Sequence, residues 1–439
     1  LDCSVSRKFR KKGLDFIFLL YAYGKYEGEV KLNFSNLQAH YEELLSYMEM
    51  HQYSATYIDT FRSEIQRILK HADKADWKSY RDIYREYTAV LHSNDYLRNK
   101  RTIIGALEQF DLHGLFPDGR RRHSLVDRSS YNFLIPVFKE VIDFYMDYEV
   151  NRGKRESTIY TESHNTASFL VAMQSRGCKS LDSITEEDVL SFFLSASDRQ
   201  TKSCSYRKNI SAVFKAGAHW KENECRKILS FLPMLRQKRK NIQYLTPEEV
   251  SVLRKLVTDS SLSMRNAAIL ALLLYTGLRG CDISGMQLGS IDWEHDVIHI
   301  CQQKTEEPLE LPLSSTVGNI IFDYLQHERP LSNDPHLFLT ETKPYPPLKS
   351  GSIGNIVSKI MKAANLRLKT GDRKGTHIFR HNLAASLLEN GISRPVISQT
   401  LGHTAPDSLE PYLKADFIHL KKCAISIDPF PVSEEVFGR

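Results

Sequence analysis

Six polar residues in the last third of the chain have the types and the order needed to attack a phosphodiester with a tyrosine. Two arginines, a lysine and two histidines form a cationic set, and a tyrosine follows them. They are Arg279, Lys304, His377, Arg380, His403 and Tyr412. Phosphodiester transfer builds negative charge on the non-bridging oxygens, and each guanidinium can offer them a two-pronged hydrogen bond. The tyrosine would be the nucleophile, because its oxygen can hold the cut strand covalently.

The other groups needed for this chemistry are also present. A tyrosine with an ordinary pKa near ~10 must lose its proton as it attacks, and the departing sugar oxygen needs a general acid, which Lys304 could be. Neither a carboxylate cluster suited to two metal ions nor a phosphate-binding glycine loop occurs in the sequence. His377 and His381 have the i, i+4 spacing of a metal pair but lack the glutamate of a zinc motif. We therefore expect neither a metal nor a cofactor.

Local sequence signals predict the elements that position these residues. An apolar helix over 267–275 is broken by Gly277, just before Arg279. Strands over 297–301 and 309–313 predict a hairpin with Lys304 near its turn. Helices are expected over about 352–364, 377–391 and 395–401. Thr246, Pro247 and Glu249 form the start signal of another helix at the head of this region.

Upstream, helix-spaced apolar residues predict two helical blocks, over about 35–115 and 133–232. The two blocks resemble each other weakly, as Arg101, Ile104 and Leu107 match Arg207, Ile210 and Val213. Chance similarity between amphipathic helices is an equally good explanation. A basic segment follows each block, and both segments are candidates to contact a phosphate backbone rather than simple solvated linkers. Their residues are Arg120, Arg121 and Arg122, then Arg236, Lys238, Arg239 and Lys240.

Composition is ordinary for a soluble protein. The chain has 439 residues, enough for two or three domains, with 41% hydrophobic and 26% charged residues. The net charge of +6 is weak support for a polyanionic partner. Seven scattered cysteines without a Cys-x-x-Cys pair indicate a reducing compartment. The basic and aromatic run over 7–23 is not expected to be a signal peptide, and no stretch is long enough to span a membrane.

Residues 245–425 resemble the catalytic domain of the tyrosine recombinases, the phage integrase family of site-specific DNA recombinases. The family's first box is similar to the segment 275–282, where Asp282 matches a supporting carboxylate. Lys304 matches its hairpin lysine. The second box is similar to 377–381, with His381 in a supporting position, and the third is similar to 401–403. Tyr412 falls where the nucleophile is expected.

The resemblance implies the roles of these residues. Arg279, His377, Arg380 and His403 would hold the scissile phosphate, Lys304 would protonate the leaving 5′ oxygen, and Tyr412 would form a 3′-phosphotyrosine. It also implies double-stranded DNA as the partner, and a homotetramer that exchanges strands through a Holliday junction. The apolar tail after Tyr412 would then insert into a neighbouring protomer, rather than pack on its own domain.

The expected fold is mainly α with a small antiparallel β-sheet: a helical DNA clamp joined to a tyrosine recombinase catalytic domain. We expect a largely helical extra domain over 1–125, a helical core-binding domain over 130–235, the catalytic domain over 245–425 and a tail over 426–439. The extra domain could bind arm sites, extend the clamp or bind proteins.

Two rival functions stay open. A type IB topoisomerase shares the tyrosine and the cationic pocket but relaxes supercoils as a monomer. A DNA-binding regulator could keep the fold without cleaving. We expect a cytoplasmic, nucleoid-associated protein from a bacterium, a phage or a mobile element.

Overall fold

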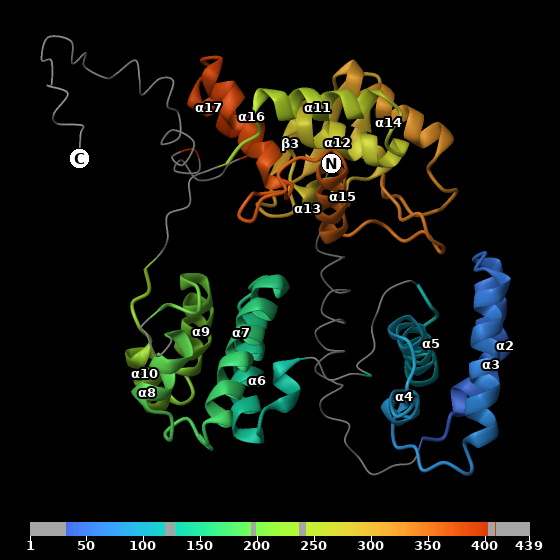
Figure 1. Ribbon diagram of the computed structural model, residues 1–439, viewed down its shortest axis with the longest axis vertical. Helices are drawn as coiled ribbons and strands as arrows, with labels where there is room; N and C mark the ends of the chain where they lie inside the picture. Colours follow the sequence, from blue (N-terminus) through green and yellow to red (C-terminus); the bar gives the residue numbers. More distant parts are fainter. Residues whose placement is uncertain are drawn as a thin grey trace, which may run out of the picture. The chain divides into compact units, whose positions relative to one another are not determined.

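The computed structural model describes residues 32–118, 125, 129–194, 199–236, 243–402 and 409. The chain divides into two compact units, Leu1–Glu49 with Ser54–Arg239, and Met50–Tyr53 with Lys240–Arg439 (Figure 1). Several sequence predictions lie outside the described residues: Arg120, Arg121, Arg122, Lys238, Arg239, Lys240, His403, Tyr412 and the tail over 426–439.

The first helical block, residues 32–118, forms four helices. They are α2 (Ser35–Met50), α3 (Ala55–His71), α4 (Tyr80–Thr88) and α5 (Asn94–His113). Ser54 and Ser93 cap α3 and α5 by accepting a backbone N–H with their side chains. Gly114 ends α5 in the left-handed conformation, which glycine adopts without strain. The predicted helical block is confirmed.

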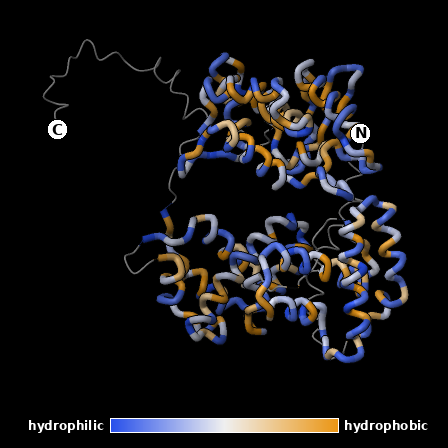
Figure 2. Tube along the Cα trace, turned by 45° about the vertical axis from the view of Figure 1, so that its right-hand side comes forward, coloured by the Kyte–Doolittle hydropathy of each residue, from blue (hydrophilic) through white to orange (hydrophobic). Residues whose placement is uncertain are grey.

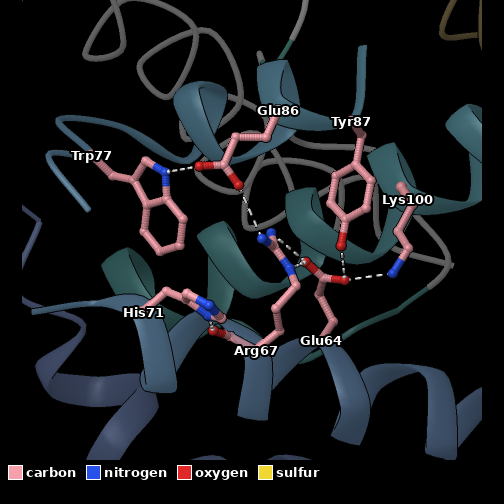
Figure 3. Close-up of polar contacts among 7 residues, drawn as sticks. All are labelled: Glu64, Arg67, His71, Trp77, Glu86, Tyr87 and Lys100. Carbon is pink, nitrogen blue, oxygen red and sulfur yellow. Dashed lines mark hydrogen bonds and ion pairs between the residues drawn. The ribbon is translucent and has the colours of Figure 1, made fainter. Parts of the chain in front are cut away.

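A buried carboxylate joins three of these helices (Figure 3). The Glu64 side chain on α3 is fully buried and forms an ion pair with Arg67 at 2.9 Å and with Lys100 of α5. The Tyr87 hydroxyl of α4 donates a hydrogen bond of 2.7 Å to Glu64 Oε2. Burial alone would raise the pKa of Glu64, but hydrogen bonds from Lys100 and Tyr87 and the charge of Arg67 lower it overall.

Removing this carboxylate should destabilise the block strongly. Glu64→Ala leaves two cations without their buried partner, which costs about 3 kcal/mol. Amide hydrogen exchange of α3 and α5 should therefore speed up by roughly 10². The lowered pKa means that the stabilisation is present at neutral pH and is lost as the pH falls below the ordinary value of 4.5.

The matched control lies on the same helix. Asp59 pairs with Arg62 on the exposed side of α3, so Asp59→Ala should cost less than about 0.5 kcal/mol. Equal exchange rates in the two variants would contradict a stabilising role for the Glu64 cluster.

The second helical block, residues 129–236, contains a short 3-10 helix, η1 (Ser130–Phe133), and five helices. They are α6 (Pro136–Asn151), α7 (Glu156–Ser175), α8 (Glu186–Phe193), α9 (Cys204–Gly217) and α10 (Glu222–Phe231). Thr185 and Asp188 form the reciprocal capping box at the start of α8. Phe138, Phe169 and Phe214 bring the apolar faces of α6, α7 and α9 into one core.

Helices α2, α3 and α5 share a pattern of buried positions with α6, α7 and α9. Buried positions of α2 and α3 recur 101 residues later in α6 and α7. The pairs are Leu37 and Phe138, Leu44 and Tyr145, Met48 and Glu149, Ile58 and Ile159, Phe61 and Glu162, Ile65 and Thr166, and Ile68 and Phe169. Ile104 and Leu107 of α5 match the buried Ile210 and Val213 of α9. Acidic side chains outnumber basic ones over 32–118, and the reverse holds over 129–236. The blocks therefore repeat a packing pattern with different charge.

The unit that carries the candidate site begins with α11 (Pro247–Thr258), which the predicted capping box of Thr246 and Glu249 opens. The next helix, α12 (Met264–Thr276), is buried along nearly its whole length and forms the centre of the core. The short helix α13 (Gly280–Gly285) and the 3-10 helix η2 (Leu288–Ser290) lead into the sheet.

The described part of this unit contains a three-stranded antiparallel sheet in the order β1-β2-β3. Its strands are β1 (Ile291–Asp292), β2 (Val297–Cys301) and β3 (Pro308–Pro312). Ile300 faces Leu309 and Ile298 faces Leu311, so one face of the hairpin is apolar and packs on the core. The predicted hairpin is confirmed, and β1 is an addition to it.

Four more helices follow in the described part of this unit: α14 (Ser315–His327), α15 (Ser350–Ala363), α16 (His377–Glu389) and α17 (Arg394–Leu401). The last three were predicted to within two residues at most ends, whereas α13 and α14 were not predicted. Hydrophobic and hydrophilic residues alternate along the helices of both units (Figure 2), as expected of helices that bury one side. Among the residues that the structure describes, no helix is both long and apolar enough to cross a bilayer.

Candidate active site

The candidate site is built on the turn that joins α12 to α13. Gly277 ends α12 with a positive φ of 62°. This left-handed backbone conformation favours glycine. A Cβ at this position would also lie 2.8 Å from a terminal methyl group of Leu383 on α16, which would have to move. Arg279 follows as the N-cap residue of α13. The turn therefore sets the backbone position from which the Arg279 side chain extends.

Arg279 is paired with the predicted supporting carboxylate. Its Nη1 lies 3.8 Å from Oδ2 of Asp282, which is 3% exposed. Both of these atoms are buried, and neither has a hydrogen-bond partner among the described residues. The other carboxylate oxygen of Asp282 accepts the Gln303 backbone N–H at 2.9 Å. Asp282 thus connects two turns. It forms an ion pair with Arg279 in the α12–α13 turn and accepts a hydrogen bond from Gln303 in the β2–β3 turn.

Lys304 lies in the turn between β2 and β3, and its side chain is exposed. The turn is closed by backbone hydrogen bonds from Gln302 N to Glu307 O at 2.9 Å and from Glu306 N to Gln302 O at 2.8 Å. A lysine on an exposed turn can reach a bound phosphodiester without leaving a buried charge behind. This placement suits a proton donor.

Arg380 occupies the inner side of α16 and is 4% exposed. Its Nη1 donates to the Gly277 carbonyl at 3.3 Å, and its Nη2 donates to the Leu401 carbonyl. The same guanidinium therefore contacts the end of α12 and the end of α17. A guanidinium carries five N–H donors in one planar fork, which suits it to contact several acceptors at once.

His377 and His381 lie one turn apart on α16, with ring centroids 6.4 Å apart. Loss of hydration lowers the pKa of His377, and the charges of Arg380, Lys304 and Arg279 lower it further. Burial lowers the pKa of His381 to about 4, helped by the charge of Arg373. Both imidazoles are therefore neutral at pH 7, and each can donate one hydrogen bond and accept another.

The structure thus brings four of the predicted residues together. Arg380 donates to the Gly277 carbonyl, two residues before Arg279, and His377 lies on the same helix as Arg380. Asp282 contacts Arg279 and the turn that carries Lys304. Asp282 and His381 lie beside them. His403 and Tyr412 lie outside the described residues, as do the predicted DNA contacts except Arg236, which is exposed after α10. No group of three or more His, Cys, Asp or Glu suited to a metal ion occurs among the residues that the structure places.

Two residues of this region were not found by reasoning from the sequence. Arg373 precedes α16 and acts electrostatically on both histidines. Its position four residues before His377, next to Lys374, was a signal that could have identified it. Gln302 is fully buried under the β2–β3 turn, and a glutamine beside another at the end of a strand-like run gives no such signal.

Comparisons with known proteins agree with this arrangement. The phage integrase family model matches residues 243–419. The putative integrase/recombinase y4gC of Sinorhizobium fredii is 34% identical over 170 residues, which are 39% of this chain and 86% of that relative. The putative integrase/recombinase y4rF of the same organism is 31% identical over 172 residues, and this chain covers only 39% of its length. The tyrosine recombinase XerD of Oceanobacillus iheyensis is 22% identical over 298 residues, 65% of this chain and 97% of the relative.

The matched segment contains the arginine turn, the lysine hairpin and the histidine helix described above. One relative is more than 30% identical and is covered over most of its length. The chain therefore belongs to the phage integrase family, the tyrosine recombinases.

Proposed function

We propose that the protein is a site-specific DNA recombinase that cuts and rejoins DNA through a 3′-phosphotyrosine intermediate. The observation that carries this proposal is the set of contacts that join the three cationic residues. Arg380 donates to the Gly277 carbonyl, two residues before Arg279, and Asp282 contacts both Arg279 and the turn of Lys304. Three cations held in one region suit a phosphodiester, whose charge increases as the transition state forms. Membership of the phage integrase family supports the same conclusion.

In the proposed reaction the Tyr412 hydroxyl releases its proton to solvent as its oxygen attacks the scissile phosphorus, and the bond from phosphorus to the 5′ oxygen breaks. Arg279 and Arg380 hold the non-bridging oxygens, with hydrogen bonds from His377 and His403. Lys304 gives its proton to the leaving 5′ oxygen. A 5′ hydroxyl of a partner strand then displaces Tyr412 and restores a phosphodiester. Because the phosphotyrosine conserves the bond energy, the reaction requires neither ATP nor a metal.

The partner of this reaction is double-stranded DNA. Arg236, with Lys238, Arg239 and Lys240 after it, would contact the phosphate backbone, as would Arg120, Arg121 and Arg122. We propose a homotetramer on two synapsed duplexes, in which the tail after Tyr412 passes to a neighbouring protomer. The relatives named above from Sinorhizobium fredii and Oceanobacillus iheyensis are bacterial proteins, which supports action on bacterial or mobile-element DNA at the nucleoid.

A strand-exchange assay tests the proposal against its two rivals. The full chain is incubated with two labelled duplexes that carry the ends flanking its native locus, in EDTA and without nucleotide. A recombinase yields a Holliday junction and recombinant strands. Relaxation of supercoiled plasmid without strand exchange would indicate a type IB topoisomerase instead, and binding without any cleavage would indicate a regulator.

A further inference from the structure

The turn that carries Lys304 is connected to the end of α17 by one buried side chain. Gln302 is fully buried, and its Nε2 donates to the Leu401 carbonyl at 3.2 Å. Its Oε1 accepts the Thr305 hydroxyl at 2.8 Å. Both ends of this amide are therefore hydrogen-bonded, one to α17 and one to the residue after Lys304. A buried amide with both ends paired fixes a local geometry, because each end would be costly to leave unpaired.

The end of α17 packs closely against the Gln302 side chain. Gly402 ends the helix with a positive φ of 59°, and a Cβ there would lie 2.4 Å from Gln302 Nε2. The Leu401 carbonyl accepts from Arg380 as well as from Gln302. One carbonyl at the helix end thus joins a phosphate-binding arginine to the lysine turn. His403 follows Gly402 directly in the sequence, and Tyr412 comes nine residues later.

We infer that Gln302 is a positioning residue, which holds the Lys304 turn in register with the end of α17. This inference rests on the proposed function, in which Lys304 protonates the leaving 5′ oxygen. Asp282 anchors the turn from the other side, through the Gln303 backbone N–H. With Gln302 removed, the turn keeps one of these two anchors. Lys304 then occupies its productive position for a smaller fraction of the time, and proton transfer to the leaving oxygen slows.

The test separates leaving-group protonation from phosphate binding. A substrate with sulfur in place of the 5′ bridging oxygen breaks a P–S bond on attack by Tyr412. It releases a thiolate, which needs no proton because a thiol has a pKa of about 8.5. Gln302→Met should slow cleavage of the ordinary substrate by about 10–100-fold. On the sulfur substrate the same variant should cleave within a few-fold of the unmodified protein.

Four further variants complete the design. Lys304→Ala should show the same pattern with a larger defect, whereas Arg380→Ala should be slow on both substrates because it loses a phosphate contact. Gln399→Met makes the same substitution on an exposed glutamine of α17 and should behave like the unmodified protein. Thr305→Val removes only the hydroxyl that donates to Gln302 Oε1. It should give a smaller version of the same pattern, and it keeps the test open if Gln302→Met fails to fold.

The outcomes distinguish two failures. If sulfur rescues Lys304→Ala but neither Gln302→Met nor Thr305→Val, or if neither of these slows the ordinary reaction, the role of Gln302 is overturned and the proposed chemistry stands. If sulfur does not rescue Lys304→Ala, Lys304 is not the general acid, and the inference about Gln302 fails with it. The thermal unfolding temperature of each variant is measured as a control, because a variant that unfolds early would cleave slowly for that reason alone.

Discussion

Tyr412→Phe should bind its DNA site with unchanged affinity and form no covalent adduct. The substitution removes a single oxygen, the one that would attack phosphorus, and leaves the aromatic ring in place. No other group in the proposed mechanism can replace this oxygen as the nucleophile, so the loss of cleavage should be complete within the range of the assay. A nicked suicide duplex is the suitable substrate, because the covalent complex of the unmodified protein accumulates on it. The amount of this complex is then measured on a denaturing gel.

A second tyrosine serves as the matched control. Tyr275 is half-buried at the end of α12, close to the arginine turn, and its ring lies against Arg254. Tyr275→Phe should form the adduct as the unmodified protein does. Peptide mapping of the adduct should give a fragment that contains Tyr412. An adduct that persists in Tyr412→Phe would show that another residue is the nucleophile.

Elements with local sequence signals were predictable. The capping box of Thr246 and Glu249, the glycine stop at 277 and the alternating strands of the β2–β3 hairpin all lie within a few residues of the feature that they specify. Helix α16 was predicted from residue 377 and begins there. Propensity and capping act over one helical turn, so the sequence carries this information directly.

The features that were not predicted depend on distant partners. Strand β1 has two residues and exists because Ile291 pairs with Ile298. The Gln302 amide reaches Leu401, 99 residues away, and Arg380 reaches Gly277. Such contacts depend on how helices pack, and one sequence contains no periodic signal for them. The helical repeat lies between these cases. The sequence similarity of α5 to α9 is weak, and the two helices bury matching positions, Ile104 and Leu107 in α5 and Ile210 and Val213 in α9.

The structure makes a sharper prediction for Arg380 than the sequence alone allows. From sequence, Arg380 is one of two arginines that hold a phosphate. In the structure it also donates to the Gly277 and Leu401 carbonyls. The end of α12, which sets the position of Arg279, and the end of α17, which precedes His403, therefore both depend on one planar guanidinium. Loss of the planar guanidinium should therefore displace both the end of α12, which positions Arg279, and the end of α17.

Arg380→Lys keeps the positive charge but removes the planar guanidinium. It therefore tests the contribution of the guanidinium geometry separately from that of the charge. A lysine has three donors on one nitrogen and cannot contact both carbonyls and a phosphate oxygen from one position. We expect cleavage to fall by ~10² or more, as for the loss of a donor to a developing oxyanion, while DNA affinity changes far less. Arg394→Lys, on the exposed start of α17, should leave cleavage unchanged. Cleavage by Arg380→Lys within a few-fold of the unmodified protein would mean that charge alone, without the planar fork, is sufficient at this position.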